Sequence, residues 1–173
     1  MKEIMETVAG LMALSARTAP KAGGKDFLEV RVLKGREINK LAADMEKYGK
    51  ETGRGNFDRD SANVKESDSV LLVSLNDAKV TGLNCGACGV ENCSDLNSGS
   101  FVGPEFDGPW CAWRLIDLGI ALGSAVKTAS THNADNRIMY RIGVSAKRLG
   151  LIAGEVVVGV PISASGKSIY FDR

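Results

Sequence analysis

The spacing of apolar residues in the first half of the chain predicts a helix, a strand and a second helix. Residues 3–16 and 36–50 have apolar side chains three or four positions apart, which places them on one face of a helix. These side chains are Ile4, Val8, Leu11 and Met12 in the first helix and Ile38, Leu41, Ala42 and Met45 in the second. Between the helices, residues 26–33 alternate apolar and charged positions, as a strand covered on one face does. The polar residues 52–67 are expected to form a long surface loop.

Two more strands and two more helices are predicted in the rest of the chain. Residues 70–73 and 156–160 are continuous apolar runs, typical of strands buried on both faces. Helices are expected at residues 112–130 and 135–150, the second with Asp135 as its N-cap and Gly150 at its end. Their apolar positions are Leu115, Leu118, Leu122 and Val126, then Ile138, Ile142, Ala146 and Leu149. Strands separated by helices indicate an α/β or α+β fold, with a small central sheet flanked by helices.

Composition and charge narrow the class of protein. The 173 residues are enough for one domain with its own core, and 44% hydrophobic with 25% charged residues is typical of a globular chain. A formal net charge of +1 argues against a dedicated nucleic-acid binder. The N-terminal residues are acidic where a secretory signal needs cations, and the longest uncharged run of the most apolar helix covers residues 118–126, where a membrane span needs about 20. We therefore expect a single cytoplasmic domain, residues 1–173, without a membrane span.

The segment 84–111 differs from the rest of the chain because it lacks periodicity and contains all four cysteines and five glycines. The cysteines are Cys85, Cys88, Cys93 and Cys111, with the spacing C-x2-C-x4-C-x17-C. In a reducing compartment, four cysteines favour metal or redox chemistry over disulfides. A short loop that supplies three thiolates, with a fourth farther along, suits an iron–sulfur cluster, and Gly86 and Gly89 let backbone N–H groups approach the sulfurs. We expect this insert to bind one four-iron, four-sulfur cluster.

Other interpretations of the cysteines stay open. A zinc site also takes four cysteines, although structural zinc folds usually pair two close-spaced knuckles, and here 17 residues separate the last two cysteines. Plant-type two-iron ferredoxins use C-x4-C-x2-C with a remote fourth cysteine, the reverse order of this triplet. Disulfides, or cysteines without a common role, are a third alternative.

Two resemblances support the cluster. Residues 85–93 together with Cys111 resemble the four-iron, four-sulfur module of corrinoid iron–sulfur proteins and of membrane electron-transport complexes. Three further phrases resemble a family of uncharacterised prokaryotic proteins that contain a ferredoxin domain. These phrases are ARTAPK at 16–21, DLGIALGSA at 117–125, and SGK at 165–167 with FDR at 171–173. The family resemblance implies a prokaryotic, often anaerobic, setting and names no reaction.

The residues around the cysteines suggest how the cluster is surrounded. The insert has four acidic residues and neither Lys nor Arg: Glu91, Asp95, Glu105 and Asp107. Such a patch would attract a basic redox partner protein and lower the reduction potential, unless it is an ordinary solvated loop. Trp110 and Trp113 flank Cys111 and either shield one side of the cluster from water or pack in the core.

Cations outside the insert suggest an anion site. Those that we select are Arg17, Lys21, Lys25 and Lys167, as contacts to an anion or a flavin phosphate. A similarity to flavin-binding nitroreductases rests on the Ala19-Pro20 turn and on residues 159–161 (GVP) at the end of a late strand, and it implies FMN as a second cofactor. Residues 21–24 depart from the asparagine-containing turn of those enzymes, and the chain starts too late to supply their arginine-rich phosphate segment. GKS at 166–168 lacks the spacing and the following helix of a phosphate loop.

The prediction from sequence is an iron–sulfur protein that transfers single electrons. The alternatives are a reductase, in which the cluster supplies electrons to a flavin or a substrate, and a cluster that acts as a sensor or a structural staple. Gly119 and Gly123, four positions apart, allow close helix packing, which we expect within the domain, with a homodimer as the alternative. The single histidine, His132, is expected on the surface.

Overall fold

A computed structural model describes residues 1–96 and 101–171. Residues 97–100 of the insert, and Asp172 and Arg173 of the C-terminal phrase, lie outside the described residues. The helices are α1 (Lys2–Thr18), α2 (Arg36–Thr52), α3 (Phe57–Lys65), α4 (Ala112–Thr131) and α5 (Tyr140–Arg148), with short 3-10 turns at Ala22–Gly24 and Cys93–Asp95. The strands are β1 (Leu28–Lys34), β2 (Ser69–Leu75), β3 (Asp135–Asn136) and β4 (Val156–Ser163).

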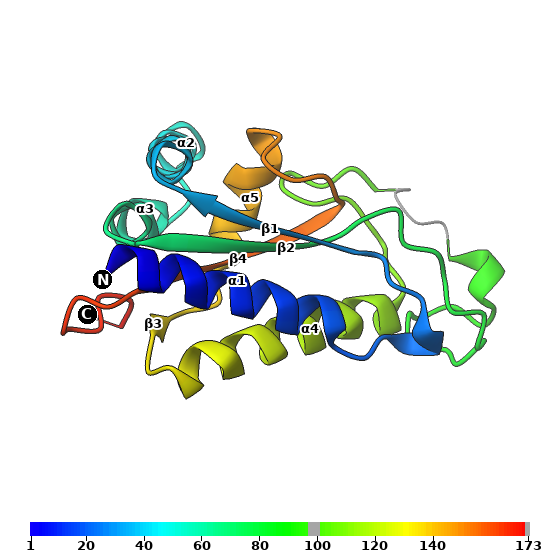
Figure 1. Cartoon of the computed structure of the whole chain (residues 1–173). Helices are drawn as coiled ribbons and strands as arrows, with labels where there is room; N and C mark the ends of the chain where they lie inside the picture. The colour runs from blue at the N-terminus through cyan, green and yellow to red at the C-terminus, as the bar shows by residue number, and fades with distance from the viewer. Residues whose placement is uncertain (97–100, 172–173) are drawn as a thin grey trace.

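The molecule is a three-layer sandwich around one antiparallel sheet, with strand order β1-β2-β4-β3 (Figure 1). Helices α1 and α4 cover one face, and α2, α3 and α5 cover the other. Strand β2 lies between β1 and β4 and is buried along its whole length, because its side chains point alternately into the two cores. The predicted fold class and the burial of this strand on both faces are confirmed.

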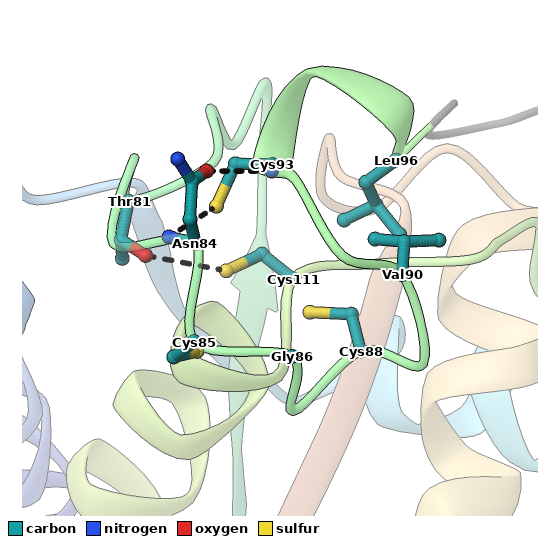
Figure 2. A pocket seen from close by; sticks show the side chains of 9 residues that line it. All are labelled: Thr81, Asn84, Cys85, Gly86, Cys88, Val90, Cys93, Leu96 and Cys111. Atoms are coloured by element: carbon teal, nitrogen blue, oxygen red, sulfur yellow. Dashed lines mark hydrogen bonds between the residues drawn. The ribbon is translucent and has the colours of Figure 1, made fainter.

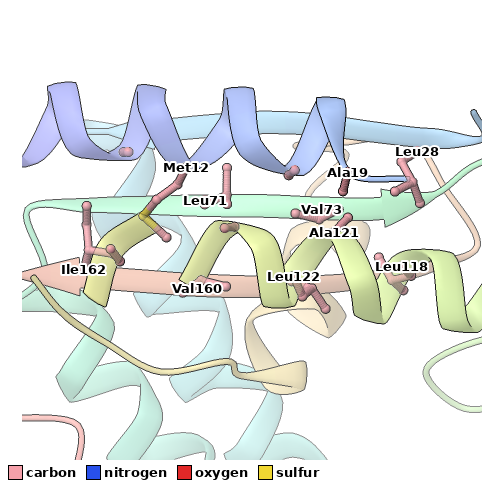
Figure 3. Packing of buried hydrophobic residues seen from close by; sticks show 14 of the residues in the cluster. Met12, Ala19, Leu28, Leu71, Val73, Leu118, Ala121, Leu122, Val160 and Ile162 are labelled. Atoms are coloured by element: carbon pink, nitrogen blue, oxygen red, sulfur yellow. The ribbon is translucent and has the colours of Figure 1, made fainter. Parts of the chain in front are cut away.

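The core between the sheet and the α1/α4 pair uses small residues where the two helices meet. Ala9 and Ala16 of α1 and Ala121 and Ala125 of α4 are fully buried, beside larger side chains such as Met12 (Figure 3). Alanine is only weakly hydrophobic, so the spacing of larger apolar residues did not identify the buried faces of these helices correctly. Five predicted core positions are exposed by 39–57%: Ile4, Leu11, Leu115, Ile138 and Leu149. In α2, all four predicted positions are buried.

Two local predictions are wrong. Much of the segment 52–67 is helix α3 and not loop, because Phe57 and Val64 are buried in the core and the buried Asp60 pairs with Arg141 at 2.9 Å. Asp135 caps no helix, since it lies in β3 and pairs with Ser163 of β4. Helix α5 starts five residues later at Tyr140, whereas its end before the left-handed Gly150 agrees with the prediction.

The outer face of α4 contains the two glycines of the predicted helix contact. A Cβ atom added to Gly119 or Gly123 would meet nothing within 4 Å, so the expected packing within the domain is wrong. A homodimer stays a prediction for this face. His132 is exposed just beyond the end of α4, as expected. Among residues 1–96 and 101–171, the helices are all too short or too polar to cross a membrane.

Candidate metal centre

The cysteine loop and the start of α4 lie at the end of the sandwich opposite the N-terminus (Figure 1). The chain leaves the sheet after Leu75, the end of β2, and returns to the body at Cys111, the residue before α4. In between, a turn at Gly86 and Gly89, both with positive φ, bends the cysteine loop back on itself. The expectation that glycines shape this loop is confirmed.

The cysteines line a single pocket (Figure 2). Cys111 is 4% exposed and forms its inner wall, whereas Cys85 is exposed at the rim. Val90 and Leu96 add apolar lining. Among the described residues, no three His, Cys, Asp or Glu side chains converge closely enough to hold a single metal ion.

Each cysteine sulfur has a hydrogen-bonding group next to it. The contacts are Asn84 N to Cys93 Sγ at 3.3 Å, Ala112 N to Cys88 Sγ at 3.1 Å, Trp113 Nε1 to Cys85 Sγ at 3.2 Å, and the Thr81 hydroxyl 3.8 Å from Cys111 Sγ. The side chain of Asn84 also accepts a hydrogen bond from Cys93 N at 2.8 Å, which fixes this part of the loop (Figure 2). Hydrogen bonds of this kind orient thiolate ligands and stabilise their charge.

The first turn of α4 borders the pocket and contributes both a cysteine and a hydrogen-bond donor to it. Cys111 occupies the N-cap position, and the next residue, Ala112, donates its backbone N–H to Cys88 Sγ. The N-terminus of a helix carries partial positive charge from its unpaired N–H groups. This end of α4 therefore favours negative charge in the pocket.

The surroundings of two cysteines favour the thiolate, which is the form that binds metals. Hydrogen bonds from the Ala87 backbone and then from the Trp113 indole lower the pKa of the Cys85 thiol. Burial by itself would raise the pKa of Cys111, but hydrogen bonds from the backbone of Thr81 and Arg114 outweigh it, so that this pKa is also lowered. The pocket thus suits negatively charged sulfur.

A buried ion pair behind the pocket joins three segments of the chain. Arg114 and Asp117 are 2% and 3% exposed, and their charged atoms lie 3.0 Å apart. The Arg114 guanidinium donates to the backbone carbonyls of Lys79 and Ala22 at 2.8 and 3.0 Å. Asp117 accepts the Ala22 N–H at 2.8 Å. The pair thereby fixes the segment leading to Cys85 against the start of α4.

The predicted acidic patch is smaller than the sequence indicated. Glu105 lies 3.4 Å from Arg54, and Asp107 lies 3.4 Å from Lys147, so cations from the body of the domain offset both. The negative charge that remains near the cysteine loop is that of Glu91 and Asp95. The two tryptophans also differ, because Trp110 donates to the Asp107 carbonyl at 2.6 Å and contacts none of the sulfurs through its indole N–H.

The structure does not bring the four selected cations together. Arg17 binds Asp26 at 2.9 Å, and Lys21 donates to the carbonyls of Ala16 and Arg17 at the end of α1, with its side chain only 6% exposed. Lys25 lines a hollow with Thr81 and Arg114 beside the cysteine loop. Lys167 belongs to the segment after β4, and this segment lies beside the start of β2, at the end of the sheet opposite the cysteine loop.

Four residues that shape the site were not selected from the sequence: Thr81, Asn84, Arg114 and Asp117. A usable signal existed for the last two, since a pair of opposite charges three positions apart interrupts an apolar helix next to Cys111. Thr81 and Asn84 act through loop geometry, which has no periodic signature.

Comparison with known proteins identifies a relative that covers almost the whole chain. An uncharacterized protein of Archaeoglobus fulgidus is 50% identical over 171 residues, which cover 99% of this chain and 92% of that protein. A family model described as "uncharacterized protein containing a ferredoxin domain (DUF2148)" matches residues 107–173. The chain belongs to one family with the Archaeoglobus protein, and its residues 107–173 match this model. The matched residues of this ferredoxin-domain family include Cys111, and the other three cysteines precede them.

Solved structures show what the fold resembles. A nitroreductase with bound FMN from Desulfitobacterium hafniense superposes with a TM-score of 0.60 and 14% identity, covering 93% of this chain and 78% of that one. Nitroreductase A from Vibrio parahaemolyticus gives a TM-score of 0.58 and 11% identity, covering 94% of this chain. The chain spans only 60% of the length of the Vibrio protein. The chain therefore has a nitroreductase-like fold.

The buried ion pair gives a stability prediction. Replacing Asp117 with Ala leaves Arg114 buried without its carboxylate, which typically costs about 3–5 kcal/mol. Glu46→Ala is the matched control, because it removes another intrahelical pair, with Lys50, whose partners are both more than half exposed, and should cost about 0.5 kcal/mol or less. Urea unfolding of anaerobically purified proteins measures both. Similar unfolding free energies for the two variants would contradict the role given to Asp117.

Proposed function

We propose that this ferredoxin-domain protein holds one four-iron, four-sulfur cluster on Cys85, Cys88, Cys93 and Cys111 and transfers single electrons. The observation that carries the proposal is the common pocket of the four sulfurs, each with a hydrogen-bonding group beside it. A bound cluster of this type accepts and releases one electron at a time through its thiolate ligands. The resemblance of the cysteine spacing to the corrinoid iron–sulfur module supports the four-iron form.

The residues of the chain have distinct tasks in this function. The backbone N–H groups of Asn84 and Ala112 hold two of the sulfurs in place and offset their charge. The apolar side chains of Val90 and Leu96 reduce the access of water to the pocket. The exposed Cys85 gives electrons the shortest path to a partner protein, and the acidic Glu91 and Asp95 of the same insert favour a basic partner.

Metal and sulfide analysis of protein purified without oxygen tests the proposal. We expect about four iron and four acid-labile sulfide per chain, and a brown colour that Cys93→Ser largely removes because one ligand is lost. Ser94→Ala is the control, since it changes the next residue, whose hydroxyl contacts only Asp95 among the described groups. A colourless protein with stoichiometric zinc and no iron would exclude the cluster.

A second candidate function is a flavin-linked reductase in which the cluster supplies electrons to FMN. The observation that favours it is the nitroreductase-like fold, because one structure that superposes on this chain is described with bound FMN. The α/β body of the chain is also larger than a simple electron carrier needs. Lys25 and Arg114 line the hollow next to the cysteine loop and are the cations that we assign to a phosphate or another anion there.

Flavin content separates the two candidates. If the chain is a flavin-linked reductase, heat-released supernatant of native protein contains FMN, and Lys25→Ala weakens the binding of added FMN severalfold through loss of a cation at the hollow. Lys167→Ala is the control, since this residue belongs to the segment after β4, at the end of the sheet opposite the cysteine loop. Absence of flavin in native protein together with no measurable binding of FMN would exclude the second candidate.

A further inference from the structure

Trp113 contacts the cluster pocket through its indole ring. Its Nε1–H donates to Cys85 Sγ at 3.2 Å. Cys85 is exposed, and Trp113 is 38% exposed, so this hydrogen bond lies at the solvent edge of the pocket. The other sulfurs receive their contacts from backbone N–H groups or from the hydroxyl of Thr81.

The position of Trp113 is fixed by the same helical turn that closes the pocket. Cys111, Ala112 and Trp113 are consecutive, and each places a different atom on the pocket: a sulfur, a backbone N–H and an indole N–H. The next residue is the buried Arg114, which holds this turn against the Lys79 and Ala22 carbonyls. The indole is therefore presented to Cys85 by a rigid element.

We infer that Trp113 is a positioning residue that raises the reduction potential of the cluster through its hydrogen bond to Cys85; the inference rests on the proposed function. Reduction adds one electron, and the thiolate sulfurs take up part of the added negative charge. An N–H donor stabilises the more negative state and so favours reduction. Glu91 and Asp95 act in the opposite direction, so the potential reflects a balance between these acidic residues and the indole N–H.

The matched pair of variants is Trp113→Phe and Trp110→Phe. Both keep an aromatic ring, but only the first removes a donor from a sulfur, because Trp110 donates to the Asp107 carbonyl. Dithionite titration under anaerobic conditions, followed by visible absorption and electron paramagnetic resonance, measures the midpoint potential of each. We expect Trp113→Phe to have a more negative potential than the wild type, and Trp110→Phe to match the wild type.

The sign of the change separates hydrogen bonding from shielding. If Trp113 only kept water from the cluster, opening the site would raise the potential or leave it unchanged. An unchanged or raised potential in Trp113→Phe, or an equal fall in Trp110→Phe, would overturn the inference. A wild-type protein that binds no iron would instead refute the proposed function before any variant is measured.

A second experiment works even if Trp113→Phe does not hold a cluster. The chain has only two tryptophans, so the Trp110→Phe background leaves Trp113 as the single one. Growth with 5-fluorotryptophan then makes the N–H of this indole more acidic at almost constant volume, which strengthens the hydrogen bond. We expect a more positive potential than in unlabelled Trp110→Phe, and no change in the potential on labelling would overturn the inference.

Discussion

The site depends on the buried pair of Arg114 and Asp117. Two charges removed from water are tolerated only if hydrogen bonds replace the lost hydration, and here the backbone at Ala22 and Lys79 supplies them. These contacts hold the connection from α1 to β1 and the segment after β2 against the start of α4. Because Cys111 directly precedes this turn, the ion pair determines where the fourth sulfur lies relative to the other three.

Helix α4 links the pocket to the fold. Its first turn faces the sulfurs, while Leu118, Ala121 and Leu122 pack farther along in the core with α1 and the sheet. The insert is short of apolar residues, so it relies on this helix and on the end of β2 for its position. A nitroreductase-like sandwich thereby provides the rigid support that the cysteine loop lacks by itself.

The features that were predictable are those with a periodic or chemical signature. The fully buried β2, the face of α2 and the four cysteines stood out from spacing and residue type. Helix α3 did not, because it is polar and stays folded through a few buried residues and the contact of Asp60 with Arg141. Backbone N–H groups near the sulfurs were expected in the loop of Gly86 and Gly89. The backbone donors at Asn84 and Ala112 and the indole donor of Trp113 were not, because they reach the sulfurs through loop and helix geometry that appears only in three dimensions.

The most direct test of the central claim is a low-temperature electron paramagnetic resonance spectrum of the anaerobic, dithionite-reduced protein. A four-iron cluster on the four cysteines predicts a fast-relaxing signal of a single unpaired electron that is absent before reduction and integrates to about one spin per chain. A slowly relaxing signal visible at much higher temperature would indicate a two-iron cluster and contradict the four-iron assignment. A spectrum without any signal, from protein that contains zinc, would contradict the account of the site as a redox centre.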